Sequence, residues 1–230
     1  MAFRLYFALT GAEFHLCNAP PTHCGWLACH FSPYGTGITN IPQNLPNDSM
    51  LILDDSTPIN GHDPALIKMQ IQELLSCGTI ASVLLDFQRP PAAESLAMAK
   101  ALTVLPCPVV VSESYAKDLS CPVFLPPPPL HLPLHTYIAP WQGREIWLEA
   151  ALGQECVAVT KEGLCTDRPW THSDNPAHFS QELACHYKIV PLEDEIRFLF
   201  HRTREDLDAL LALAESLGIS RAIGLYQELA

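Results

Sequence analysis

One stretch of the sequence decides the fold: Ser82-Val83-Leu84-Leu85-Asp86-Phe87-Gln88-Arg89-Pro90. A short apolar run that is followed directly by an aspartate, and then by a proline pair, is typical of a buried parallel strand. Such a strand places its carboxylate at the end of a barrel. Helix-like segments flank the stretch at residues 64–77 and 92–105. The stretch is therefore the strand of a strand–helix repeat.

The composition is that of a folded, acidic protein. The chain has 230 residues, of which 48% are hydrophobic and 17% are charged, and its formal net charge is −12. This length fits one α/β-barrel domain or two small domains. The negative charge argues against nucleic acids and anionic membranes as partners, because both are bound through clustered Lys and Arg. The sequence gives no indication of an oligomeric state.

Three further features indicate a location in the cell. Residues 1–9 contain an arginine inside their apolar run, which is typical of a first strand and not of an export signal. No stretch has the roughly 20 apolar residues that span a bilayer. The nine cysteines are odd in number and irregularly spaced, which favours reduced thiols over a disulfide framework. We therefore expect a cytoplasmic protein.

The repeat predicts eight strands. They are expected at residues 3–9, 50–53, 81–87, 109–111, 123–125, 146–148, 196–200 and 221–226, and residues 25–31 are a candidate for a further strand. We expect a compact, irregular (β/α)8 TIM-type barrel of the α/β class with some helices missing. A doubly wound open sheet is the alternative, but no glycine-rich phosphate turn follows any strand.

The chain is expected to be a single barrel domain over residues 1–230, in which residues 151–195 form a β-rich insertion. Residues 156–160 and 164–166 are typical of a β-hairpin with a glycine turn, and residues 187–190 are a candidate third strand. The insertion interrupts the repeat between two predicted barrel strands.

Polar side chains follow most of the predicted strands. Because the carboxyl ends of barrel strands converge on one face, these side chains should form one rim. Two rim carboxyls could act as general acid and as nucleophile or base on a glycosidic bond, or several could bind a hard divalent cation. The structural alternative is that acidic residues cap the helices after each strand. The rim positions are Asp54, Asp55, Asp86, Gln88, Glu113, Glu149, His201, Gln227 and Glu228.

The end of the opening stretch, Asp86-Phe87-Gln88-Arg89-Pro90, resembles the Asp-Trp-Glu-Tyr-Pro end of the signature strand in chitinase-like glycoside hydrolases. Residues 222–226 loosely resemble the final strand of that family, which ends in a sugar-stacking aromatic residue. The resemblance implies a barrel with a saccharide cleft. In the family the signature strand is the fourth, whereas here it is the third unless residues 25–31 belong to the barrel.

Two residues depart from the family pattern. Leu84 replaces an aspartate, and Gln88 stands where the family has its proton-donating glutamate. An amide cannot serve as a general acid. The resemblance therefore implies a saccharide-binding barrel in which hydrolysis is impaired or absent.

The rim and the resemblance together predict the site residues. Asp86, Glu113 and Glu149 are the candidate catalytic residues. No metal and no cofactor is expected, with a divalent cation as the alternative, and a small saccharide is the expected partner. Trp147 and Tyr226 are included as aromatic faces for sugar rings, although core packing is the more common role for such residues. The candidate substrate-binding residues are Asp54, Asp55, Gln88, Trp147, Tyr226, Gln227 and Glu228.

A second cluster of potential ligands lies near the amino terminus, at His15, Cys17, His23, Cys24, Cys29 and His30. Cys24 and Cys29 have the widest spacing of the usual Cys-x2–4-Cys knuckle, but no second matching pair follows. The sequence therefore does not predict a zinc site there, and leaves metal binding by residues 15–30 open.

Three functions remain at this point. The first is a glycosidase-like barrel that binds a saccharide and has lost or relocated hydrolysis. The second is an active hydrolase: either a glycosidase that uses Asp86 with Glu113 or Glu149, or a metal-dependent phosphoesterase that uses Asp54, Asp55 and Glu149. The third is a non-enzymatic interaction protein that docks a partner through residues 156–190.

The thiol state gives the first testable prediction. Titration of the denatured protein without reductant should find seven or more of the nine cysteines as free thiols, because the count and the spacing do not fit a disulfide framework. Three or fewer free thiols would instead indicate a disulfide scaffold and a different compartment.

Overall fold

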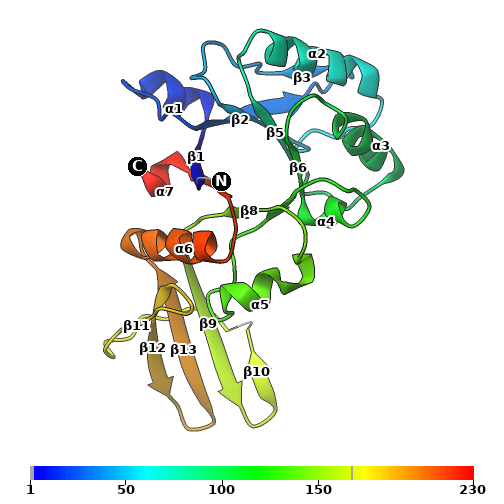
Figure 1. Ribbon diagram of the computed structural model, residues 1–230. Helices are drawn as coiled ribbons and strands as arrows, with labels where there is room; N and C mark the ends of the chain where they lie inside the picture. The colour runs from blue at the N-terminus through cyan, green and yellow to red at the C-terminus, as the bar shows by residue number, and fades with distance from the viewer. Residues whose placement is uncertain (1–2, 167) are drawn as a thin grey trace.

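The computed structural model describes residues 3–166 and 168–230, which form a closed parallel barrel and a smaller antiparallel sheet that projects from it (Figure 1). Eight strands make the barrel, and all neighbouring pairs among them are parallel. The ring is closed by pairing between the two strands that come first along the chain. In order around the barrel they are β1 (Arg4–Leu9), β2 (Cys24–Phe31), β4 (Met50–Asp54), β5 (Ser82–Asp86), β6 (Val109–Ser112), β7 (Val123–Leu125), β8 (Ile146–Glu149) and β14 (Arg221–Leu225).

The helices outside the barrel are incomplete, as the sequence predicts. Three of them are long, namely α2 (Pro64–Ser76), α3 (Ala93–Leu102) and α6 (Arg204–Ser216). The Asp63 side chain caps α2 by accepting the backbone N–H of Ala65 at 2.9 Å, with Pro64 as the first helical residue. The short helices are α1 (Gly11–Leu16), α4 (Glu113–Ala116), α5 (Leu134–Ile138), with a 3-10 turn at Ala139–Trp141, and α7 (Tyr226–Leu229).

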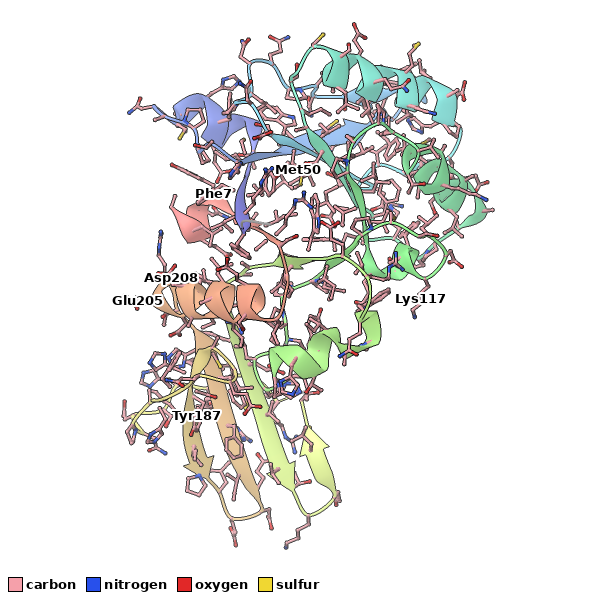
Figure 2. All side chains as sticks on the ribbon, viewed as in Figure 1. Phe7, Met50, Lys117, Tyr187, Glu205 and Asp208 are labelled. Carbon is pink, nitrogen blue, oxygen red and sulfur yellow. The ribbon has the colours of Figure 1, made fainter. Side chains whose placement is uncertain are left out.

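Alternation along the strands divides the core into two parts. Side chains at every second position fill the inside of the barrel, where Met50, Leu84 and Trp147 are almost completely buried. Figure 2 labels Met50 among them. The positions between them, such as Val83 and Leu85, pack outward under the helices. A residue's parity on its strand therefore decides whether it can reach the mouth of the barrel.

One of the eight strand predictions is wrong. Residues 196–200 lie on β13 (Glu195–Arg202), which pairs antiparallel with its neighbours in the smaller sheet. The missing barrel strand is β2, the former candidate at residues 25–31. It carries a register shift between Trp26 and Cys29 and pairs with the two-residue strand β3 (Ile38–Thr39) at its end. The signature strand, β5, is therefore the fourth of the barrel.

The insertion is larger than the sequence predicts. It runs from Gly153 to Arg202, compared with the predicted 151–195. Its five strands lie side by side in the order β10-β9-β13-β12-β11. The Glu155 carboxylate ties it to the segment after β7, because it accepts the backbone N–H of Leu130 at 2.7 Å. Its remaining strands are β9 (Gly153–Thr160), β10 (Gly163–Cys165), β11 (His178–Ser180) and β12 (Cys185–Pro191).

The cysteine thiols and the lengths of the helices bear on two of the sequence predictions. All nine cysteines are free thiols in the structure. Within residues 3–166 and 168–230, no helix combines the length and the apolar character needed to cross a membrane.

Two strand glycines give a matched test of the packing at the mouth of the barrel. A Cβ at Gly224 would collide with the backbone oxygen of Ala150 and with the side chain of Leu229, whereas a Cβ at Gly153 would lie 3.6 Å from Leu130, an ordinary contact. Gly224→Ala should therefore lower the free energy of unfolding by about 1–3 kcal/mol. Gly153→Ala should change it little. Urea unfolding measures both, and equal effects would contradict this account of the packing.

Candidate functional site: an acidic cleft at the mouth of the barrel

The polar side chains that follow the barrel strands meet at one end of the barrel. His30, Asp54 and Asp86 are in register on the adjacent strands β2, β4 and β5. Glu149 ends β8, and Glu113 follows β6 directly. The structure therefore places Asp54, Asp86, Glu113 and Glu149 on the same end of one closed barrel, as predicted.

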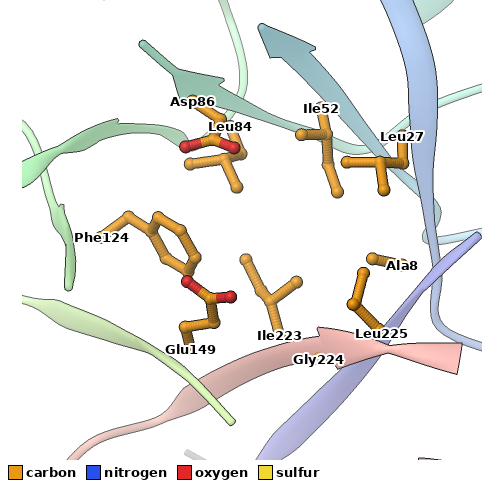
Figure 3. Close-up of a pocket in the computed structure, with 10 residues that line it drawn as sticks. All are labelled: Ala8, Leu27, Ile52, Leu84, Asp86, Phe124, Glu149, Ile223, Gly224 and Leu225. Carbon is orange, nitrogen blue, oxygen red and sulfur yellow. The ribbon is translucent and has the colours of Figure 1, made fainter. Parts of the chain in front are cut away.

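Two adjoining cavities form a cleft at this end. The inner cavity, of about 110 Å³, has a floor of aliphatic side chains such as Ile52, Leu84 and Ile223. Asp86 and Glu149 face it from opposite walls (Figure 3). The side cavity, of about 190 Å³, is lined by Gln88 and Glu113, and it shares Phe124 and Glu149 with the inner one. We call the two together the rim cleft.

Glu149 holds the most perturbed carboxyl group of the cleft. Burial, together with the negative charges of Asp86 and Glu228, raises its pKa to about 7. Each of these causes disfavours the ionised form. Glu149 is consequently protonated in a large fraction of molecules at neutral pH, which is the state that a general acid needs.

Asp86 lies in a similar setting with one opposing contact. Burial raises its pKa, and the charges of Asp54 and Asp55 act in the same direction, but a hydrogen bond from the Gln88 amide lowers it. That bond runs from Gln88 Nε2 to Asp86 Oδ1. The amide therefore stabilises the ionised form of Asp86, and the carbonyl oxygen of Gln88 is left to accept from a ligand.

Asp55 has a structural role. The prediction that it binds substrate or a cation is therefore corrected. Asp55 is 2% exposed, and its carboxylate accepts the backbone N–H of Gln88 at 2.8 Å and of Arg89 at 3.0 Å. Arg89 in turn donates to the backbone oxygens of Asp55 and Ser56. Asp55 therefore fixes the loop that carries Gln88, and it does not converge with Asp54 and Glu149 on a cation.

The structure adds two rim residues that sequence reasoning missed. The Nδ1 atom of His30 lies 2.5 Å from Oδ2 of Asp54, and both side chains are partly exposed. Burial and the charges of Glu113 and Glu149 raise the pKa of Tyr137, whose hydroxyl donates to the backbone oxygen of Pro126 at 3.0 Å. Glu113 itself accepts from the Trp141 indole N–H at 3.3 Å.

Four other residues that the sequence places in the site do not line the rim cleft. Trp147 is fully buried one layer deeper in the barrel, stacked on Tyr6 and covered by Arg221. Tyr226 points outward, where its hydroxyl lies 3.4 Å from the thiol of Cys17. His201 lies on the insertion sheet, and the exposed Gln227 lines neither cavity. Neither aromatic residue can therefore stack on a sugar in the rim cleft.

Glu228 does lie near the cleft. Its carboxylate accepts the backbone N–H of Leu152 at 3.0 Å and contributes to the raised pKa of Glu149. Among the described residues, no group of three or more His, Cys, Asp or Glu side chains could hold a metal ion, and the segment 15–30 is included in that search.

The overall architecture matches several solved structures. The chain is similar to the spore cortex-lytic enzyme SleL of Bacillus cereus, with 10% identity and a TM-score of 0.54. The match covers the whole of this chain and 72% of the SleL chain. The chain is similar over 98% of its length to 95% of a chitinase-like agglutinin of Robinia pseudoacacia, with 10% identity and a TM-score of 0.55. The fold is that of the chitinase-like glycoside hydrolases.

A third match is a class V chitinase of Nicotiana tobaccum, solved as a Glu-to-Gln mutant in complex with NAG4. The chain covers 94% of it and matches over 98% of its own length, with 8% identity and a TM-score of 0.51. No protein-family model and no curated protein matches the sequence. At these identities the likeness establishes the chitinase-like fold, and the chemistry of the cleft has to be argued from its own residues.

The raised pKa of Glu149 predicts a stability effect. An acid whose folded pKa lies above its unfolded pKa of about 4.5 loses stability as the pH rises through that interval. Glu149→Gln should therefore be more stable than the wild type by about 1–3 kcal/mol near pH 8.5. The advantage should shrink to about 0.4 kcal/mol near pH 4.5, where the folded carboxyl is protonated and the unfolded one is half protonated.

Urea unfolding at both pH values measures this difference. The matched control is Glu162→Gln, a change at an exposed position in the turn between β9 and β10, which should show no pH-dependent difference from the wild type. A Glu149→Gln variant that is destabilised equally at both pH values would contradict the assigned charge state.

Proposed function

We propose that the protein binds a saccharide in the rim cleft and hydrolyses it weakly or not at all. The observation that carries the proposal is the pairing of Gln88 with Asp86 at the mouth of a chitinase-like barrel. In the resemblance drawn from the sequence, position 88 is that of the proton donor. An amide can donate and accept hydrogen bonds, but it has no acidic proton to give to a leaving group.

The groups around the cleft suit a polar, uncharged ligand. The cleft combines an aliphatic floor with hydrogen-bonding groups from Gln88, Asp86 and Glu113. Carboxylates accept from sugar hydroxyls or N-acetyl N–H groups, and the Gln88 carbonyl can do the same. Several carboxylates in one cleft would repel an anionic ligand. We therefore propose neutral oligosaccharides, N-acetylated ones in particular, as the ligands.

The chitinase-like structures support saccharide binding, but they do not determine whether this chain is a hydrolase. They include a cortex-lytic enzyme, a chitinase mutant in complex with NAG4 and an agglutinin. Both catalysis and binding alone thus occur on this fold. The glutamine at position 88 is the reason to place this chain among the binders.

A second function, hydrolysis with a relocated acid, is favoured by one observation. Glu149, with a pKa of about 7, faces the same cavity as Asp86. A general acid and a second carboxyl group on opposite walls of one cavity are the pair that glycosidic hydrolysis requires. In this alternative Glu149 protonates the leaving group, and Asp86 acts as base or nucleophile.

The decisive variant is Gln88→Glu. A glutamic acid of nearly the same size beside Asp86 should have a raised pKa, because the two negative charges repel. We expect the wild type to bind N-acetylglucosamine oligomers with little turnover, and Gln88→Glu to gain weak hydrolysis of an aryl N-acetylglucosaminide. Gln142→Glu, a change at an exposed position outside both cavities, is the matched control and should gain nothing.

The same assay separates the two functions. Robust wild-type hydrolysis that survives Gln88→Ala and disappears in Glu149→Gln would establish Glu149 as the acid and replace the first proposal with the second. Failure of the wild type to bind any N-acetylglucosamine oligomer would reject the first proposal.

A further inference from the structure

A second pocket lies on the outside of the barrel wall. It is bounded by α1, by the outer face of β2 and by the loop after β3, and its volume is about 410 Å³. Figure 1 shows α1 beside β2, where the strand is followed by β3 and a loop instead of a covering helix. We call this the wall pocket. Its volume falls in the range of about 300–1,000 Å³ that is usual for small-molecule sites.

The floor of the wall pocket is aromatic and held in place. Trp26 donates its indole N–H to the backbone oxygen of Asn40 at 2.8 Å. Phe14 packs edge-on against it, with ring centroids 5.8 Å apart and an interplanar angle of 82°. Gly11 also lines the pocket, and a Cβ there would come within 3.4 Å of the indole ring. The missing side chain at position 11 therefore keeps this part of the pocket open.

The edge of the wall pocket is polar but carries no permanent charge. His15, Asn40 and Gln43 have exposed side chains at its edge, and Ile41 adds an apolar surface. None of the residues that line it is a carboxylate, a lysine or an arginine. Amide and imidazole groups offer both donors and acceptors. A ligand that matches this lining has hydroxyl or amide groups, an apolar face and no net charge.

We propose that the wall pocket is a second saccharide-binding site, separate from the rim cleft. A sugar ring has one face of C–H groups that can lie against Phe14 and Trp26, and hydroxyl groups that can bond to Asn40 and Gln43. An anionic ligand is disfavoured, because the lining has no Lys or Arg and the chain has a net charge of −12. A purely apolar ligand would leave the amide edge without partners.

The two sites lie back to back on one strand. Trp26 and Ala28 line the wall pocket on the outer face of β2, whereas Leu27 between them lines the inner cavity. A polysaccharide bound in the wall pocket is therefore separated from the rim cleft only by the thickness of strand β2. The wall pocket does not depend on the rim cleft to bind, so each site can be tested without the other.

The test is calorimetric titration with N-acetylglucosamine tetramer. Two variants act on the wall pocket: Gly11→Leu fills it, and Gln43→Ala removes an exposed amide with little risk to folding. Gln181→Ala, at an exposed position on the insertion, is the matched control, and Gln88→Leu acts on the rim cleft. We expect two binding sites in the wild type. Each wall variant should weaken one of them about tenfold or more and leave the other unchanged, and Gln88→Leu should do the reverse.

The other outcomes are distinct. Wild-type binding at both sites in Gly11→Leu and Gln43→Ala would overturn the wall-pocket proposal, while leaving the rim cleft supported if Gln88→Leu still weakens binding. Loss of all binding in the wall variants, with Gln88→Leu equal to the wild type, would support the wall pocket and reject the rim cleft as a saccharide site. Absence of binding in the wild type would reject both.

Discussion

Closure of the barrel by the pairing of β1 with β2 is the constraint on which the rest of the structure depends. In a closed ring, every inward side chain at the carboxyl ends of the strands faces the same space. In this chain several of those side chains are carboxyls, and the layer beneath them is apolar. The cleft and its negative charge both follow from that enforced proximity.

Burial and neighbouring negative charges raise the pKa of both central carboxyl groups, and the two differ in what opposes that rise. Glu149 is buried near other negative charges, which favours its protonated form. Asp86 is also buried, but the amide of Gln88 stabilises its ionised form. Asp55, deep beneath the loop, holds Gln88 in place through two backbone amides. Gln88 thus stabilises the negative charge of Asp86 by donating a hydrogen bond to it.

The sequence was sufficient for the barrel strands that consist of a short apolar run with an acid at the end, such as β4, β5 and β8. It leaves β2 as a candidate strand only, because the bulge in β2 breaks the alternation. The prediction for residues 196–200 is wrong, because an apolar run has the same pattern in an antiparallel sheet as in a barrel. Strand parity could have separated Asp54 from Asp55, and Tyr226 from the cleft. The sequence indicates His30 only as a potential metal ligand, because β2 is no more than a candidate strand at that level. Tyr137 has no sequence signal, because it lies in a short helix after a proline-rich run.

The most direct test of the account is a titration of methyl-labelled protein with N-acetylglucosamine tetramer, followed by NMR. Leu84, Ile52 and Ile223 line the floor of the inner cavity, so a saccharide in the rim cleft should shift their methyl signals in a saturable way. Methyl groups beneath the outer helices, such as those of Ile67 and Ile71, should not move. Saturable binding that leaves Leu84, Ile52 and Ile223 unshifted would contradict the assignment of the rim cleft as a saccharide site.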